Sequence, residues 1–159
     1  KKDLILQAGA VSRNLWFIRK GLVRLYYIEE GNEISTYFAT DGQVFTSFSS
    51  FISQTPSFEY IECLEDCDLV NISYEQMQSL YQKIPQWERL GRILAESNYK
   101  CILNRSISLQ VKTGRQRYLE FLQTNPAKIV EQVPQYQIAS FLGIKAESLS
   151  RIKKKLKTA

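Results

Sequence analysis

Side chains that can contact nucleic acid gather near the end of the chain, between Gln135 and Leu156. Glu147, Ser148 and Arg151 would fall on one face of a helix, because positions three and four apart are neighbours there. An arginine can donate two hydrogen bonds to guanine, and a glutamate can accept one from cytosine. The lysines that follow are Lys153, Lys154, Lys155 and Lys157. These residue types predict a surface that contacts base edges and carries cations for phosphates.

The apolar residues of the same stretch have the spacing of a helix-turn-helix. They are Ile138, Leu142, Ile144, Leu149, Ile152 and Leu156. Ala139 is small, which lets the two helices approach closely. Gly143 can adopt the positive φ that ends the first helix and opens the turn. An αα-hairpin inside a core would place apolar residues in the same way, so the spacing alone leaves both interpretations open.

Positive charge is concentrated in the last third of the chain. The 159 residues carry a formal charge of +5. From Lys112 onward, ten Lys or Arg stand against three acidic residues, whereas the preceding 111 residues hold eleven against thirteen. A basic module on a slightly acidic remainder is typical of a protein whose last third meets a polyanion. A solvated lysine face is the alternative explanation.

The first 72 residues have the pattern of short strands rich in β-branched and aromatic residues. The predicted strands are 16–18, 22–28, 34–38, 44–48, 60–64 and 69–72, with turns at 30–32 and at Asp41-Gly42. Short strands at this spacing predict a β-sandwich or barrel. The least regular segment runs from Phe48 to Tyr60, and loops of that length in small β domains are often where ligands bind.

The period of the pattern changes to that of a helix at Ser73. Ser73 and Gln76 match a capping box, and Pro85 starts a second, longer helix. That helix has two apolar stripes, of which one can cover the β domain and the other needs a partner. We assign dimerisation to the stripe of Trp87, Leu90, Leu94 and Cys101; the second stripe contains Ile93, Ile102, Leu103 and Ile107. Packing of both stripes within one chain is the alternative.

A hinge is predicted at Lys112-Thr113-Gly114, where the helical pattern is interrupted. Thr113 can cap the next helix, which is expected over 115–122. Ile129 and Val130 are predicted to form a short strand before the helix-turn-helix.

A β domain, a long apolar helix, a hinge and a helix-turn-helix, in this order, resemble the Crp-Fnr superfamily of bacterial transcription regulators. The residues that carry the resemblance are Gly21 to Arg24, Asp41-Gly42, Ile72 to Tyr74, Thr113 to Arg115 and Ile138 to Leu156. The resemblance implies an α+β fold with a jelly-roll-like β-roll and a short helix over 1–84. The resemblance further implies a dimerisation helix over 85–111. It places a DNA-binding domain over 112–159, which lacks most of the family's terminal wing.

The resemblance also implies a homodimer whose second helices enter the major groove at two half-sites about 34 Å apart. Position by position, Glu147 and Arg151 match the family's base-reading pair. Further DNA contacts are expected from Gln135, Lys145, Ser148 and Lys155. Ala146 stands where the family often has an arginine, so one base contact is expected to be lost. Lys145 occupies the usual Ser or Thr cap position, which weakens capping but adds a cation near the backbone.

The predicted effector site departs from the family pattern. Members that bind cyclic nucleotides have a glycine-glutamate-leucine motif and an arginine shortly after it, where this chain has Thr46-Ser47-Phe48 and Ser57. Without the arginine for the phosphate and the glutamate for the ribose, we expect no cyclic AMP binding of physiological strength. An unknown effector could occupy a pocket of Phe45, Ser47, Phe48, Ser57 and Tyr60. Packing alone is the alternative role of these aromatic residues.

The amino-acid composition limits the catalytic and metal-binding functions that the chain could have. The absence of histidine removes the commonest general base and metal ligand, and we expect no enzyme and no cofactor. An iron-sulfur cluster would need an N-terminal cysteine cluster, and the haem branch commonly uses histidine. Glu59, Glu62, Glu65 and Asp66 are expected to be solvated. Cys63, Cys67 and Cys101 are expected to be free buried thiols, with a redox switch or half a metal site at the first two as the alternative.

The expected partners are double-stranded DNA, a second copy of the chain, RNA polymerase and an unidentified small effector. No apolar run reaches the roughly 18 residues of a membrane span, and there is no secretory signal, so a cytoplasmic location is expected. The missing initiator Met suggests that the first residues of the gene product are absent. The competing hypothesis is a small-molecule sensor whose helix-turn-helix contacts proteins rather than DNA.

Overall fold

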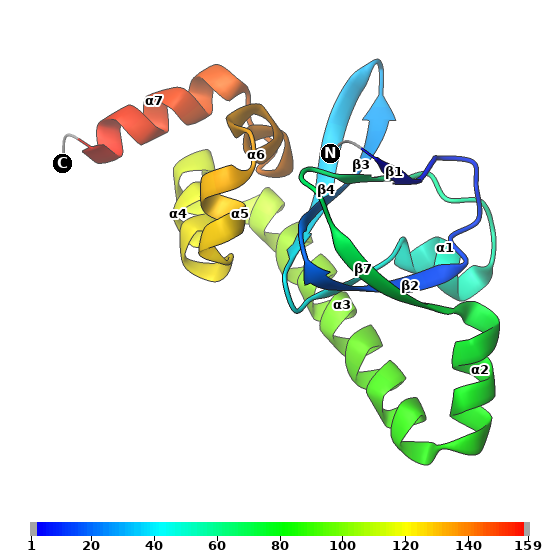
Figure 1. The fold of residues 1–159 in the computed structure, drawn as a ribbon. Coiled ribbons are helices and arrows are strands. Elements are labelled where there is room, and N and C mark those ends of the chain that lie inside the picture. Colours follow the sequence, from blue (N-terminus) through cyan, green and yellow to red (C-terminus); the bar gives the residue numbers. More distant parts are fainter. Residues whose placement is uncertain (1–2, 158–159) are drawn as a thin grey trace.

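Two antiparallel sheets form the N-terminal part of the computed structural model, which describes residues 3–157 (Figure 1). The strand order is β1-β6-β3-β4 in the four-stranded sheet and β5-β2-β7 in the three-stranded sheet. The strands are β1 (Leu4–Leu6), β2 (Asn14–Lys20), β3 (Leu22–Glu29), β4 (Asn32–Thr40), β5 (Val44–Phe45), β6 (Tyr60–Cys63) and β7 (Asp68–Ser73). Residues of both sheets, among them Ile18, Val23 and Ile61, form a fully buried core. This is the predicted β-roll.

The predicted strands are confirmed apart from the segment after Phe45. Strand β5 ends at Phe45, and Phe48–Ser53 forms the short helix α1 where a strand end and an irregular loop were predicted. The Phe51 amide donates to the Ser47 carbonyl at 2.8 Å, and the Phe51 ring is buried, so packing of one aromatic side chain favours a helical turn here. Strand β1 was not predicted.

Strand β4 contains a bulge that positions a hydroxyl group inside the β-roll. Leu25 pairs with Tyr37 and Tyr26 pairs with Ser35, which leaves Thr36 without an opposite residue on β3. A bulge bends the strand and re-aims a side chain. The Thr36 hydroxyl donates to Glu59 Oε1 at 2.7 Å.

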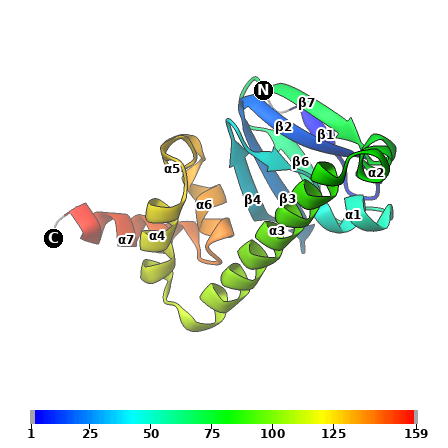
Figure 2. The ribbon, with the colours of Figure 1, turned by 90° about the horizontal axis from the view of Figure 1, so that it is seen from below.

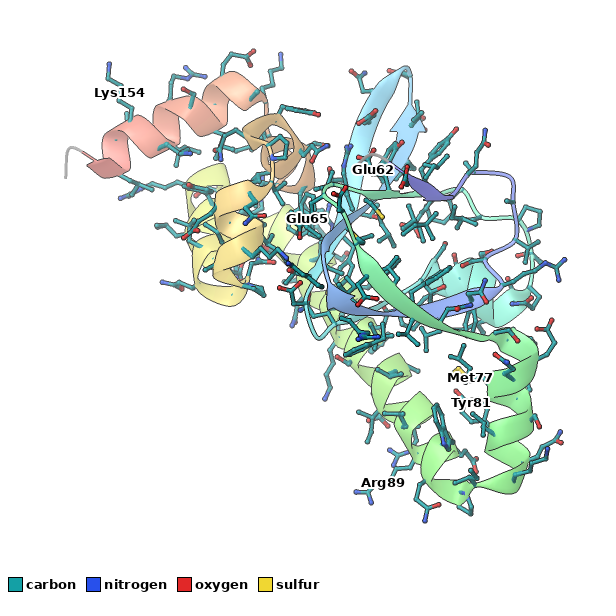
Figure 3. The ribbon with its side chains drawn as sticks, viewed as in Figure 1. Glu62, Glu65, Met77, Tyr81, Arg89 and Lys154 are labelled. Carbon is teal, nitrogen blue, oxygen red and sulfur yellow. The ribbon has the colours of Figure 1, made fainter. Side chains whose placement is uncertain are left out.

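Helices α2 (Tyr74–Lys83) and α3 (Pro85–Val111) follow the β-roll and form a hairpin (Figure 1). The predicted capping box is confirmed, because the Ser73 side chain accepts from the Gln76 amide and the Gln76 side chain accepts from the Ser73 amide. Helix α3 has 27 residues and is therefore about 40 Å long. Tyr81 of α2 packs directly on Gly91 of α3, where a Cβ atom would lie 2.1 Å from the phenol oxygen. Figure 3 shows Met77 and Tyr81 on the side of α2 that faces α3.

Four helices complete the described part of the chain: α4 (Gly114–Thr124), α5 (Ala127–Gln132), α6 (Gln135–Phe141) and α7 (Ala146–Lys157). Thr113 caps α4 through a capping box with Gln116, as predicted. Gly143 has φ +63° in the turn between α6 and α7, which confirms its predicted role.

The predicted strand at Ile129 and Val130 is wrong, since both residues lie in α5. The Pro126 carbonyl accepts from both of their amides, and Ile129 is buried among the neighbouring helices. An isolated strand there would have no partner for its backbone groups, whereas a helical turn satisfies them locally.

The helical domain packs against the four-stranded sheet (Figure 2). One apolar cluster contains Leu22 and Phe38 of the sheet together with buried residues of α4 to α7. Phe38 and Phe141 have ring centroids 5.4 Å apart. Lys128 of α5 reaches Asp41 at 2.9 Å and Glu65 at 2.5 Å, both on the β-roll. Figure 3 shows Glu65 at this junction.

A buried arginine ties three strands of the four-stranded sheet together. Arg24 of β3 is 1% exposed, and its Nη1 lies 2.6 Å from Glu33 Oε2 and 3.0 Å from Glu62 Oε1. Its Nε donates to Ser35 Oγ at 2.9 Å. Removal of one member of a buried ion pair leaves the other charge without compensation, which costs much more than the pair contributes.

We predict that Arg24→Met lowers the free energy of unfolding by about 3 kcal/mol, because Glu62 is left largely buried without its cation. Urea denaturation followed by circular dichroism measures the loss. Arg19→Gln is the matched control: Arg19 and Asp68 are 63% and 55% exposed, and such a surface pair contributes about 0.5 kcal/mol or less. Equal losses for the two variants would contradict a special role for Arg24.

Candidate nucleic-acid interface and effector site

Helix α7 projects from the molecule on the side away from the β-roll (Figure 1). Glu147, Arg151 and Lys155 follow one another at intervals of four, and all three side chains are exposed. Arg151 Nη2 donates to Ser148 Oγ at 3.3 Å, which connects two of the predicted contact residues on one face. Figure 3 shows Lys154 on the outer side of the helix. The arrangement presents an acceptor and several cations on one accessible helix.

The opposite face of α7 is held by apolar packing. Leu149 and Ile138 are each 1% exposed, and Ala139 lies buried between the helices as the spacing predicts. The turn packs closely on the start of α4, where a Cβ atom on Gly114 would lie 2.9 Å from Ile144 Cγ2. These contacts fix the orientation of α7 relative to the rest of the domain.

The remaining predicted DNA contacts lie at the starts of the two helices. Gln135 is the exposed first residue of α6. Lys145 precedes α7, and its carbonyl accepts from the amides of Ser148 and Leu149 while its side chain is exposed. Ala146, where the family often has an arginine, is also exposed. Gln135 and Lys145 are therefore accessible at the starts of α6 and α7.

The predicted effector cassette is filled by a buried hydrogen-bond network. Ser47 is 0% exposed and donates to Glu59 Oε2 at 2.9 Å, while Ser57 donates to Ser47 Oγ at 2.9 Å. The Thr36 hydroxyl binds the other carboxylate oxygen, and the Glu59 amide donates to Ser57 Oγ at 2.9 Å. These are the two serines that the sequence comparison predicts at the ribose-binding and phosphate-binding positions. The internal Glu59 carboxylate thus accepts from Ser47 and Thr36, and Ser57 joins the network through Ser47.

The expectation that Glu59 is solvated is wrong. The side chain is 9% exposed, because it follows an irregular segment and enters β6 with its carboxylate turned into the β-roll. The sequence contains one signal that could have found it: hydroxyl residues at 36, 46, 47 and 57 need a buried acceptor if their strands pack together.

The aromatic residues of the predicted effector pocket do not converge on one cavity. Phe45 is 1% exposed and belongs to the β-roll core. Phe48 packs with Phe51 near the start of α2, and Tyr60 stacks on Tyr26 with ring centroids 5.2 Å apart. Their positions favour the packing alternative.

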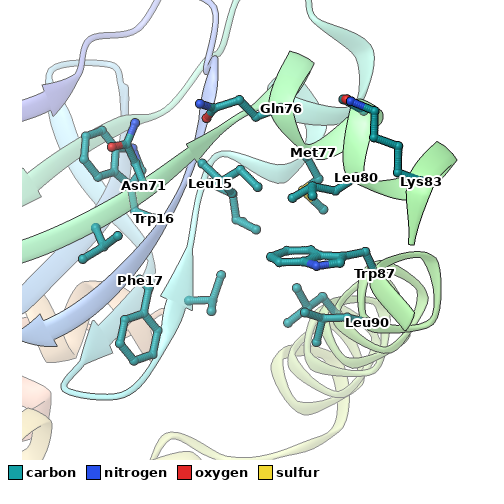
Figure 4. Close-up of a pocket in the computed structure, with 16 residues that line it drawn as sticks. Leu15, Trp16, Phe17, Asn71, Gln76, Met77, Leu80, Lys83, Trp87 and Leu90 are labelled. Carbon is teal, nitrogen blue, oxygen red and sulfur yellow. The ribbon is translucent and has the colours of Figure 1, made fainter. Parts of the chain in front are cut away.

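The two apolar stripes of α3 differ in exposure. Trp87 and Leu94, which the sequence assigns to dimerisation, are half-buried against their own chain, whereas Leu90 and Cys101 are exposed. Trp87, Leu90 and Leu94 line an apolar cavity of about 700 Å³ between α3, α2 and the β5-β2-β7 sheet. Figure 4 shows Trp87 and Leu90 across this cavity from Leu15 and Phe17. The second stripe, Ile93, Ile102, Leu103 and Ile107, is between 43% and 58% exposed.

The cysteines are free thiols. Cys63 is buried, and burial raises its pKa to about 12, assisted by the neighbouring Cys67 thiol. Cys67 is half-buried and Cys101 is exposed, so only Cys63 matches the expectation of a buried thiol. Among residues 3–157 no group of three or more Cys, Asp or Glu could hold a metal ion.

Comparison with known proteins agrees with this architecture. The sequence profile of the cyclic nucleotide-binding domain matches residues 1–84, which is more than half of the chain. No curated protein matches the sequence. FixK2 from Bradyrhizobium japonicum superimposes with a TM-score of 0.86 at 19% identity, covering 99% of this chain and 81% of its own.

Two further solved structures have the same fold. The c-di-GMP responsive regulator CLP of Xanthomonas campestris has a TM-score of 0.74 at 20% identity, over 99% of this chain and 84% of its own. A variant of CooA from Carboxydothermus hydrogenoformans has a TM-score of 0.76 at 20% identity, over 99% and 73%. The chain belongs to the cyclic nucleotide-binding domain family, and its whole fold is shared with the solved structures of FixK2, CLP and CooA. None of its described helices is long and apolar enough to cross a membrane.

We predict that Glu59→Ala lowers the free energy of unfolding by about 2 kcal/mol, because the hydroxyls of Ser47 and Thr36 lose their buried acceptor. Glu59→Gln keeps the size and one acceptor oxygen, so we expect a loss of about 1 kcal/mol. Thermal and urea unfolding measure both changes. Glu29→Ala, at an exposed position on β3, is the control with an effect within about 0.5 kcal/mol. A Glu59→Ala protein as stable as the parent would contradict the network.

Proposed function

We propose that this chain is a transcription regulator that binds specific DNA sequences as a homodimer. The observation that carries the proposal is the exposed face of Glu147, Arg151 and Lys155 on a helix held by a helix-turn-helix core. Arg151 is suited to a guanine and Glu147 to a cytosine, while Gln135, Lys145, Ser148 and Lys155 are suited to phosphates. The excess of basic residues from Lys112 onward agrees with a polyanionic partner.

We propose that the two copies associate through the exposed face of α3. Of the residues that the sequence assigns to dimerisation, Leu90 and Cys101 are exposed, whereas Trp87 and Leu94 are half-buried against their own chain. With the exposed second stripe of Ile93, Ile102, Leu103 and Ile107, they leave a long helix with an apolar surface in water. Burial of that surface against a second copy contributes roughly 25 cal/mol per Å² of apolar area. Two helices packed in parallel would present two copies of α7 related by two-fold symmetry, as half-sites about 34 Å apart require.

We propose that the β-roll does not respond to cyclic AMP. The support is chemical: Ser57 stands where a phosphate would need an arginine, and the buried Glu59 carboxylate lies beside it and would repel an anion. Cyclic nucleotide binding would require both the loss of this network and the burial of a second negative charge. An effector of the regulator would therefore have other chemistry, and RNA polymerase would be a further partner at a promoter.

We predict that Arg151→Ala weakens binding to a selected operator by about 1 to 3 kcal/mol and relaxes the sequence preference, because a bidentate base contact is lost. Lys155→Ala is the matched variant: it should weaken binding to all sequences alike and reduce the salt slope by about 1. Selection of bound genomic fragments followed by mobility-shift titration at several salt concentrations measures both. A protein that prefers no sequence at any salt concentration would refute the proposal.

We predict that calorimetric titration with cyclic AMP gives no binding at micromolar concentrations, because the cassette holds an internal carboxylate and no phosphate-binding cation. The double variant Ser57→Arg with Glu59→Ala supplies the cation and removes the carboxylate, and we expect it to bind the nucleotide more tightly than the parent does. Micromolar affinity of the parent chain would contradict the prediction.

A further inference from the structure

A second cavity lies where the β-roll, α3 and the helical domain meet. Its volume is about 350 Å³, which is within the range of small-molecule sites. Figure 2 shows the elements that surround it: β4 on one side, α3 below and the helical domain opposite. Its lining includes Phe38 of β4, Arg105 of α3, Glu120 and Phe121 of α4, and Phe141 of α6. Thr36, whose hydroxyl binds Glu59, also lines the cavity, so the cavity borders the network around Glu59.

Arg105 brings a positive charge to this cavity without an anionic partner. Its Nη2 donates to the Ser35 carbonyl at 3.1 Å, and the guanidinium carbon lies 4.1 Å from the centre of the Phe141 ring. In the described part of the chain, no carboxylate lies within ion-pair distance of it. Burial lowers the pKa of Arg105, as expected for a cation that is partly removed from water. Its Nε and Nη1 remain available as donors.

The other charged residues of the cavity are compensated within the protein. Arg117 donates from Nε to the Leu142 carbonyl at 2.8 Å and from Nη1 to the Lys112 carbonyl at 2.6 Å. Glu120 accepts from Lys112 Nζ at 2.7 Å, and this hydrogen bond lowers its pKa. The helix-end carbonyls offset the first charge and Lys112 offsets the second. Arg105 is therefore the charged group of the cavity with which an anionic ligand would pair.

We propose that this cavity binds a small organic carboxylate with an apolar body, held by Arg105. One carboxylate supplies a single negative charge and two acceptor oxygens, which match one guanidinium with two available donors. The apolar body would pack against Phe38, Phe121 and Phe141. A phosphate fits less well, because its second charge would have no cation in this setting.

A ligand in this position touches both parts of the chain. Arg105 lies on α3, while Phe38 belongs to the β-roll and Phe121 to the helical domain. A ligand that contacts both parts stabilises the arrangement in which they are packed together. The size of this effect is set by the difference between the ligand's binding free energies in the two arrangements. An effect on DNA affinity would follow, and that consequence rests on the proposed DNA-binding function.

The test uses benzoate as the probe and needs no DNA, so its outcome does not depend on the proposed function. Isothermal titration calorimetry of the full chain compares benzoate with its uncharged analogue benzamide. We expect benzoate to bind at least about tenfold more tightly, because benzamide cannot form the charge-assisted pair. We also expect the Nε–H resonance of Arg105 to shift in the NMR spectrum when benzoate is added.

Variants at Arg105 locate the site. Arg105→Gln should weaken benzoate binding by about tenfold or more, while Arg105→Lys keeps the charge and should weaken it less. Arg19→Gln, an exposed position on β2, is the control and should leave the affinity unchanged. Circular dichroism establishes that each variant is folded. Equal affinity for benzoate and benzamide, unchanged benzoate affinity in folded Arg105→Gln, or tighter binding of phenyl phosphate than of benzoate would each overturn the proposal.

Discussion

The packing of α6 on the edge of β4 is the contact on which the arrangement of the whole chain depends. Strand β4 is an edge strand, and edge strands leave backbone N–H and C=O groups without a partner. Ser140 of α6 supplies that partner: its hydroxyl accepts from the Ser35 amide at 3.0 Å and donates to the Glu33 carbonyl at 2.8 Å. Arg105 satisfies the Ser35 carbonyl from α3. One serine and one arginine thus take the place of a neighbouring strand.

The same strand connects the two functional regions. Thr36, the bulged residue, binds the Glu59 carboxylate through its hydroxyl; the adjacent Ser35 contacts α6 through its backbone. Leu25 and Tyr26 of β3 pair on either side of the bulge and fix both residues. A change in the cassette that moved Thr36 would act on a backbone that also carries the α6 contact. The contact of Thr36 with Glu59 and the contact of Ser35 with α6 are therefore made by adjacent residues of β4.

The sequence predicts those features of the structure that are determined by residues close together in the chain. The capping boxes at Ser73 and Thr113 and the positive φ of Gly143 were predictable, because each is decided by residues a few positions apart. The burial of Glu59 was missed, since its only sequence signal is a set of hydroxyl residues that come together from β4, the start of α1 and the loop before β6. The two apolar stripes of α3 were predicted from the sequence. Their exposure was not, because it depends on where α2 and β2 pack against the helix.

The two candidate ligand sites have opposite charge requirements, and this follows from single residues. In the cassette, a serine replaces the expected arginine and a glutamate is buried beside it, so a negative group is already present and another would be repelled. At the junction, Arg105 is partly buried with a neutral carbonyl and an aromatic ring as partners, so a negative group would be attracted. The chain has the fold of the cyclic nucleotide-binding domain over residues 1–84, while the cation of the proposed anion site lies on α3, outside the β-roll. Under these proposals, the ligand preference of each site depends on one or two charges, so a different preference would require no change of fold.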